Sequence, residues 1–256
     1  MCLGALVDAG VPLDYLMSEL QRLGISQEYQ LSQTSLSHNG QVANKVEVEV
    51  STASHVHRHL PDIETLIKDA NLPPPVETWS LAVFEQLAIA EGNVHGVSPN
   101  TVHFHEVGAT DAIVDIVGTC LGLHWLNVEE IYCSPLPVGG GTVNASHGQL
   151  PVPVPAVVKL WESRNVPVYS NGINKELVTP TGAAIVTTLA QAFGEFPRMT
   201  VNKVGLGAGN RQLPLPNILR LWLGETTREE SLETIAVLET QIDDLSPQVL
   251  AYCTNL

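Results

Sequence analysis

The pattern of hydrophobic and polar positions predicts a pair of helices followed by a β-hairpin at the start of the chain. Residues 1–10 and 12–24 each have apolar side chains at helical spacing and end at a glycine. Residues 25–36 and 42–50 have the pattern of strands, and the second alternates strictly between apolar and polar side chains. The Asn-Gly pair at 39–40 lies between them, as in a tight hairpin turn.

Helical and strand patterns are mixed along the rest of the chain. The helical patterns cover residues 61–67, 77–91, 109–126, 156–163 and 179–193, and the strand patterns cover 130–138, 166–170, 198–209, 216–225 and 233–243. We therefore expect an α+β fold, with helices packed on mixed sheets and two subdomains. The expected boundaries are 1–72 for the helix pair, hairpin and a histidine-containing segment, 73–242 for the main binding region, and 243–256 for the start of a further domain.

Composition narrows the class of protein. The net charge is −15, with 12 basic residues against 27 acidic ones, so we expect no nucleic-acid partner. The sequence has no apolar run of the length that crosses a bilayer and no basic, apolar leader at its N-terminus. We therefore expect a cytoplasmic protein with no membrane partner. The four cysteines form no CxxC pair, which argues against a disulfide framework and a four-thiolate zinc site.

The stretch HFHEVGATDAIVD at 103–115 is a candidate metal site. In an extended segment His103 and His105 would share one face, Glu106 follows them, and Asp111 opens the next helix. Imidazole and carboxylate groups together suit zinc, nickel, iron or manganese. The alternative from spacing alone is that Asp111 caps its helix and the histidines form hydrogen bonds in the core.

A second histidine cluster, HVHRH, alternates His55, His57 and His59. A strand would place all three on one face, and short tracts of this kind are typical of metal binding. Transient capture of a metal suits this cluster better than a fixed site does. The alternative is a solvated loop whose histidines have no metal role.

Two stretches could bind an anion. Gly139, Gly140 and Gly141 open the glycine- and proline-rich segment 138–156, which we expect to be a long loop carrying His147. TPTG at 179–182 opens a helix whose free N–H groups favour an anion, and the alternative, which the residue types favour, is a plain N-cap by Thr179. The sequence contains no Walker loop and no dinucleotide-binding fingerprint.

Together these stretches resemble one family, the nickel insertion proteins called LarC. The similarity is carried by HFHEVGATDAIVDIVG, PLPVGGGTVNASHGQLPVPVPAV, ELVTPTGAAI, VGLGAGNR and LETQIDDLSP, and it extends over nearly the whole chain in the same order. Members of this family usually begin with a strand and an SGDM motif and continue into a C-terminal domain. We therefore expect this chain to be the N-terminal portion of such a protein.

The resemblance implies a specific reaction. LarC proteins insert nickel into a pyridinium-3,5-bisthiocarboxylate mononucleotide and so make the nickel-pincer cofactor of lactate racemase-type enzymes. Ni²⁺ is then a substrate metal, and CTP with Mg²⁺ or Mn²⁺ is expected to bind only the missing C-terminal domain. The expected partners are the mononucleotide and a lactate racemase-type apoenzyme, and the protein is expected to be a homo-oligomer.

On this reading, nickel binds to His103, His105, Glu106 and Asp111. It is first captured by His55, His57 and His59. The nucleotide would be held by Gly139, Gly140, Gly141, Thr179, Thr181 and Gly182. The base that removes the ring proton would be His147 or Glu106. Two rival functions are a nickel carrier that hands metal to a partner, and a metal-dependent hydrolase in which the same cluster activates water.

Overall fold

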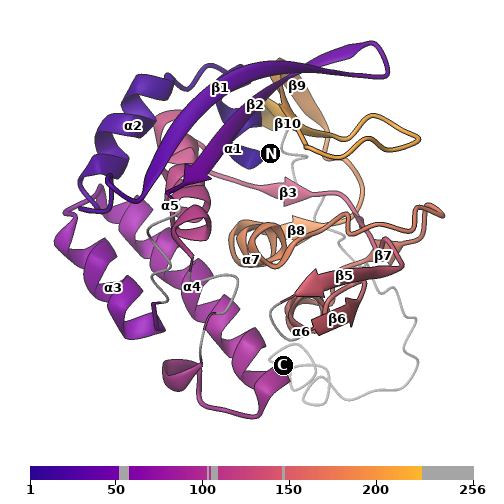
Figure 1. The fold of residues 1–256 in the computed structure, drawn as a ribbon. Helices are drawn as coiled ribbons and strands as arrows, with labels where there is room; N and C mark the ends of the chain where they lie inside the picture. Colours follow the sequence, from indigo (N-terminus) through magenta and orange to yellow (C-terminus); the bar gives the residue numbers. More distant parts are fainter. Residues whose placement is uncertain (52–57, 103, 105–108, 146–147, 227–256) are drawn as a thin grey trace, which may run out of the picture. The chain divides into compact units, whose positions relative to one another are not determined.

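The computed structural model describes residues 1–51, 58–102, 104, 109–145 and 148–226 (Figure 1). Residues 1–226 form one compact unit, and the second unit, 227–256, lies outside the described residues. The predicted α+β class is confirmed, whereas the expected boundaries at residues 72 and 242 stay predictions. Within the described residues, every helix is too short or too polar to span a membrane.

The helices are α1 (Cys2–Asp8), α2 (Leu13–Gln21), α3 (Leu60–Asp69), α4 (Pro74–His95), the 3-10 helix η1 (Pro99–Thr101), α5 (Thr110–Trp125), α6 (Pro155–Arg164) and α7 (Pro180–Leu189). The strands are β1 (Tyr29–His38), β2 (Gln41–Val50), β3 (Tyr132–Cys133), β4 (Leu136–Pro137), β5 (Thr142–Ala145), β6 (Gly148–Pro151), β7 (Val168–Tyr169), β8 (Ala192–Phe193), β9 (Met199–Ala208) and β10 (Ile218–Thr226).

The main sheet has four strands in the order β1-β2-β9-β10. The pairs β1–β2 and β9–β10 are antiparallel, and β2 runs parallel to β9 with Asn44 opposite Gly207. The predicted turn between β1 and β2 is confirmed, because Asn39 and Gly40 both have positive φ, 50° and 82°. Positive φ at both central residues is the geometry of a two-residue hairpin turn whose twist matches its strands.

Helix α1 packs against the sheet through glycines. A Cβ added to Gly205 would lie 2.0 Å from the carbonyl oxygen of Ala5, and one added to Gly207 would lie 2.0 Å from that of Met1. On its α5 side, α1 places Leu3 2.8 Å from the position of a Cβ on Gly118. Gly205 and Gly207 of VGLGAG therefore serve a close approach of helix and strand, which explains these two glycines without a dinucleotide.

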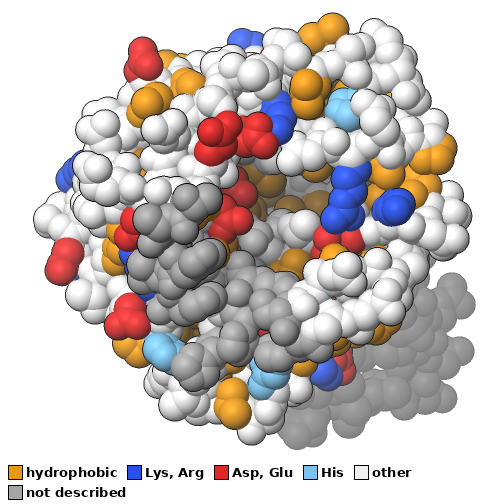
Figure 2. All heavy atoms as spheres, in the orientation of Figure 1, with side chains coloured by type: hydrophobic (Ala, Val, Ile, Leu, Met, Phe, Trp, Pro, Cys, Tyr) orange, Lys and Arg blue, Asp and Glu red, His pale blue; other side chains and the backbone are white. Residues whose placement is uncertain are grey.

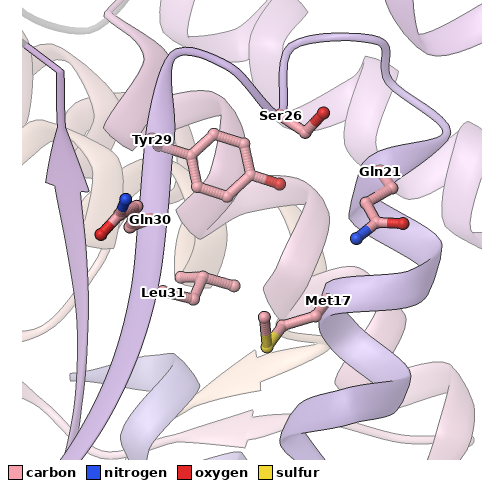
Figure 3. Close-up of a pocket in the computed structure, with 6 residues that line it drawn as sticks. All are labelled: Met17, Gln21, Ser26, Tyr29, Gln30 and Leu31. Carbon is pink, nitrogen blue, oxygen red and sulfur yellow. The ribbon is translucent and has the colours of Figure 1, made fainter.

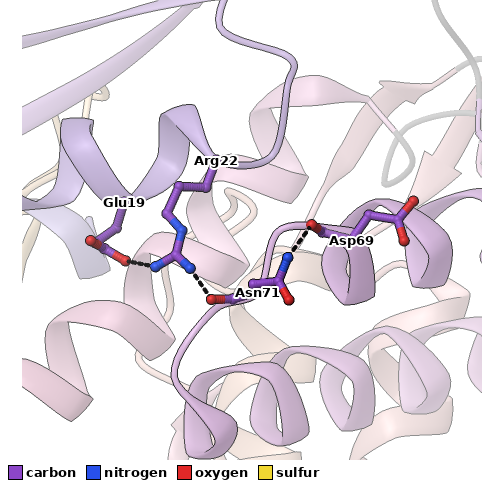
Figure 4. A network of polar contacts seen from close by, with 4 residues as sticks. All are labelled: Glu19, Arg22, Asp69 and Asn71. Carbon is purple, nitrogen blue, oxygen red and sulfur yellow. Dashed lines mark hydrogen bonds and ion pairs between the residues drawn. The ribbon is translucent and has the colours of Figure 1, made fainter.

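A layer of helices packs around α4, which contacts α3, α5, α6 and α7. Phe84 and Leu87 of α4 are fully buried in this layer. Helix α2 is tied to the connection between α3 and α4 by Arg22, which donates to Glu19 Oε2 at 2.8 Å and to the carbonyl oxygen of Asn71 (Figure 4). These contacts attach the end of α2 to the connection that leads into α4.

The glycine- and proline-rich segment 138–156 is not simply a long loop, as we had expected. It contains an antiparallel hairpin of β5 and β6, with Thr142 opposite Pro151. Each strand is only four residues long, which is too short for alternation to distinguish it from a loop. The predicted helix over 179–193 also ends early, because Ala192 and Phe193 pair in parallel with β3. The predicted strand 233–243 lies outside the described residues.

Candidate metal and nucleotide site

Five of the seven predicted metal residues, His55, His57, His103, His105 and Glu106, lie outside the described residues, as does the predicted base His147. The described ones are His59 and Asp111. Among the residues that the structure describes, no three His, Cys, Asp or Glu side chains are arranged to hold a metal ion. The geometry of the candidate site therefore comes from the residues that flank these positions.

His59 joins the two histidine stretches. Its Nδ1 lies 3.1 Å from the carbonyl oxygen of Val102, the residue directly before His103. A carbonyl only accepts hydrogen bonds, so the ring nitrogen is the donor in this contact. Metal-bound histidines usually donate one ring nitrogen to a carbonyl or carboxylate in this way. The contact joins His59, the last residue of HVHRH, to the residue directly before HFHE.

His59 also begins helix α3. It is the N-cap residue in extended conformation, and its backbone N–H donates to Asp62 Oδ2 at 3.0 Å. The predicted helix start at Pro61 and Asp62 is thus confirmed to within one residue, since α3 begins at Leu60. The cap fixes the backbone that carries the imidazole.

Asp111 lies in the first turn of α5 and is exposed. Its Oδ1 accepts the backbone N–H of Ala112 at 2.9 Å, so one carboxylate oxygen already bonds the start of the helix. This is the capping interaction weighed as the alternative to metal binding. The second oxygen is not needed for that bond, and the metal assignment of Asp111 stays a prediction.

Asp115 is a functional candidate that was not among the predicted site residues. It lies one turn after Asp111 on the same face of α5 and is partly buried. Burial raises the pKa of Asp115 to about 6; the charge of Asp111 raises the pKa further, and the terminal amine of Met1 offsets part of the shift. A carboxyl group with such a pKa can accept or release a proton near neutral pH. The sequence signal for Asp115 is its position four residues after Asp111, which places both carboxylates on one face of a helix.

Glu28 connects the segments that carry the candidate ligands. Its Oε1 accepts from Arg58 at 2.5 Å, and its Oε2 accepts from the hydroxyl of Thr110 at 2.6 Å. Its carbonyl oxygen accepts from the backbone N–H of Ser51 at 2.8 Å. Burial alone would raise the pKa of Glu28, but the hydrogen bonds from Arg58 and Thr110 and the charge of Arg58 together lower it. The carboxylate is therefore ionised at neutral pH.

Two cysteines lie near the start of α1 and in β3. Burial raises the pKa of Cys133 to about 11, with a further contribution from Cys2, whose own pKa is also raised by burial. Both thiols are therefore protonated at neutral pH in the metal-free protein. Because metals bind thiolates rather than thiols, these residues are weaker candidates for nickel than the histidines.

The glycines at 139–141 pack against the backbone of residues 174–177. A Cβ on Gly139 would lie 2.2 Å from the carbonyl oxygen of Lys175, and one on Gly140 would lie 2.7 Å from Asn174 Oδ1. The N–H of Gly140 donates to that same carbonyl of Lys175 at 3.2 Å. At least one of the three N–H groups expected to bind an anion therefore has a protein partner, whereas Gly141 is exposed.

The start of α7 follows this segment directly. Thr179 caps the helix, because its Oγ1 accepts the backbone N–H of Gly182 at 3.3 Å. The predicted capping role of Thr179 is thus confirmed, while nucleotide binding by Thr179, Thr181 and Gly182 stays a prediction. Since residues 174–177 lie against Gly139 and Gly140, the structure brings the two candidate anion stretches together.

Arg211, the last residue of the stretch VGLGAGNR, contacts the same segment, residues 174–177. Arg211 donates to the carbonyl oxygen of Glu176 at 3.3 Å and lies 3.6 Å from Glu176 Oε2. In Figure 2 the molecule is hollowed near the centre of this view, and both acidic and basic side chains lie around the hollow, with Lys and Arg side chains mainly on its right. Such a hollow presents groups of both signs, as a metal and an anionic nucleotide would require.

A separate pocket of about 260 Å³ lies between α2 and the start of β1 (Figure 3). Its lining consists of Met17, Gln21, Ser26, Tyr29, Gln30 and Leu31. Burial raises the pKa of the Tyr29 phenol, so the lining carries no charge at neutral pH. It therefore lacks the carboxylate and imidazole groups that a divalent metal needs.

Comparison with known proteins shows which family the chain is similar to. The family model described as nickel insertion protein matches residues 1–256. Among curated relatives named as nickel insertion proteins, that of Gloeothece citriformis is 63% identical over 98% of this chain and 65% of its own length. That of Synechococcus elongatus is 62% identical over 100% of this chain and 65% of its own. The chain thus spans about two thirds of the length of these relatives.

No solved structure matches the chain. The match to the family model covers every stretch discussed above, including the glycine-rich segment and both histidine clusters. The chain therefore belongs to the nickel insertion protein family.

Proposed function

We propose that this chain carries the site at which nickel is inserted into a pyridinium-3,5-bisthiocarboxylate mononucleotide, giving the nickel-pincer cofactor of lactate racemase-type enzymes. The observation that carries the proposal is the hydrogen bond from His59 to the carbonyl oxygen of Val102. It joins the flanks of the two histidine stretches, which lie about forty residues apart along the sequence. Family membership identifies nickel as the metal.

In this proposal His103, His105, Glu106 and Asp111 hold the metal for insertion. His55, His57 and His59 capture it and deliver it across the contact with Val102. Phe104 supports the arrangement, because it is buried with 1% of its surface exposed. If this stretch is extended, as the sequence predicts, the side chains on either side of Phe104 would lie on the opposite face from it. Imidazole with carboxylate is a suitable donor set for Ni²⁺.

The mononucleotide is assigned to the other group of stretches. Gly139, Gly140, Gly141 and the helix start Thr179–Gly182 offer backbone N–H groups, and Arg211 and Lys175 supply positive charge. A nickel–carbon bond forms as the ring carbon loses its proton, and that proton passes to His147 or Glu106. CTP with a divalent metal would act through the part of the protein that this chain does not include. A lactate racemase-type apoenzyme would receive the product.

Calorimetric titration of the protein with Ni²⁺ and with the mononucleotide, separately and together, tests this proposal. We expect the nucleotide to bind and nickel to strengthen its binding, because both ligands then occupy one site. Nickel binding without nucleotide binding would instead support a carrier that hands the metal to a partner. Turnover of phosphoesters or amides with Zn²⁺ or Mn²⁺ would support a hydrolase.

A further inference from the structure

We propose that Glu28 is the positioning residue of the metal site, and that its carboxylate and carbonyl hold three separate segments in the register that nickel binding requires. The inference rests on the proposed function, since it concerns the same site. Glu28 lies in the turn between α2 and β1 and belongs to none of the stretches that carry the family resemblance.

Glu28 contacts the residues on both sides of 52–57 in the sequence. Ser51 precedes residues 52–57 and donates its N–H to the Glu28 carbonyl at 2.8 Å. Arg58, within HVHRH, follows them and bonds Glu28 Oε1 at 2.5 Å. One amino acid therefore holds both Ser51 and Arg58.

The second carboxylate oxygen fixes the other part of the site. Oε2 accepts the hydroxyl of Thr110, which is the first residue of α5 and directly precedes Asp111. Arg58 also approaches the Thr110 hydroxyl at 3.4 Å, which closes a triangle of three side chains. His59, next to Arg58, adds the bond to the carbonyl of Val102. One connected network thus includes residues next to His57, His59, His103 and Asp111 in the sequence.

The burial of this network distinguishes it from ordinary surface ion pairs. The side chains of Glu28 and Arg58 are 18% and 11% exposed, and Thr110 is 1% exposed. Exposed ion pairs contribute little, whereas removing one partner of a shielded, hydrogen-bonded pair leaves an uncompensated charge. Both oxygens of Glu28 are engaged as acceptors, and these hydrogen bonds lower its pKa although burial would raise it. Glu28 is therefore suited to hold other groups in place rather than to exchange protons.

The test compares Glu28→Gln with Glu64→Gln, a matched control whose carboxylate pairs with Lys68 at 3.0 Å on the exposed face of α3. Glutamine keeps the shape of Glu28 but loses the charge that Arg58 needs. We expect the affinity for Ni²⁺, measured by calorimetry, to fall by about tenfold to a hundredfold in Glu28→Gln, the usual effect of losing an outer-shell partner. The control should bind as the unmodified protein does, and Glu28→Asp should restore part of the loss.

Amide hydrogen exchange provides a second readout that does not depend on nickel. The exchange rates of the amides of Ser51, residues 58–60, Asp62 and residues 109–112 should rise together in Glu28→Gln and stay unchanged in the control. Unchanged nickel affinity in Glu28→Gln would overturn the positioning role while leaving the proposed function intact. If the unmodified protein itself binds no nickel, both the proposed function and the positioning role are wrong. The exchange data then still decide whether Glu28 joins the three segments.

Discussion

The double substitution His103→Ala/His105→Ala is expected to abolish nickel binding and leave the fold intact. If both imidazoles bind the metal, their loss removes two ligands at once, and the affinity should fall by more than about a hundredfold, since even outer-shell partners are worth up to that much. The fold should survive because the core residue of this stretch is Phe104, which stays in place. Calorimetry with Ni²⁺ measures the loss, and thermal unfolding checks the fold.

His95→Ala is the matched control for this variant. His95 lies in the last turn of α4 beside Glu91, with 3.5 Å between the two side chains, and has no role in the proposed site. It should bind nickel as the unmodified protein does. If the double variant keeps the original affinity, the assignment of the HFHE stretch to the metal is wrong.

The substitution Asp115→Asn is expected to increase the free energy of unfolding at pH 8. Burial raises the pKa of Asp115 from 3.8 to about 6, so the folded state binds its proton more tightly than the unfolded state does. The free energy of unfolding therefore decreases as pH rises from about 4 to about 6. The expected decrease is about 3 kcal/mol, because each unit of difference between the folded and unfolded pKa contributes about 1.4 kcal/mol. Asparagine carries no charge at any pH, so the free energy of unfolding of the variant should not show this decrease.

Urea unfolding of the variant and of the unmodified protein at a series of pH values from 4 to 8 measures the difference. Asp14→Asn, which changes an exposed aspartate in the first turn of α2, is the control and should follow the unmodified protein. Parallel pH curves for Asp115→Asn and the unmodified protein would show that Asp115 titrates normally. A buried carboxylate that lowers stability at neutral pH beside Asp111 is the kind of group that catalytic sites retain.

Local patterns were sufficient to predict most of the fold. Alternation over 42–50 and the Asn-Gly pair predicted the hairpin of β1 and β2, and the apolar helix after residue 109 is α5. The patterns failed where distant pairing decides the structure. The two-residue strand β8 exists because Phe193 pairs in parallel with Cys133, sixty residues away, and no local signal predicts such a contact.

The candidate site was only partly accessible from the sequence. Residue types and spacing indicated the histidine and glycine stretches, and the capping role of Thr179 followed from TPTG before a helix. Nothing in the sequence indicated that Glu28 would connect Ser51, Arg58 and Thr110, since these contacts span 23 to 82 positions along the chain. A lone glutamate in a turn has many possible partners, and only the packing of α5 against the hairpin selects these.

The measurement that tests the central claim most directly is nickel K-edge X-ray absorption of the protein loaded with one equivalent of Ni²⁺ and no nucleotide. The proposal predicts a first shell of nitrogen and oxygen donors, with the multiple-scattering features of imidazole, that disappears in the His103→Ala/His105→Ala variant. A first shell of sulfur donors, or of water oxygens without imidazole, would contradict the claim that these histidine stretches hold the metal.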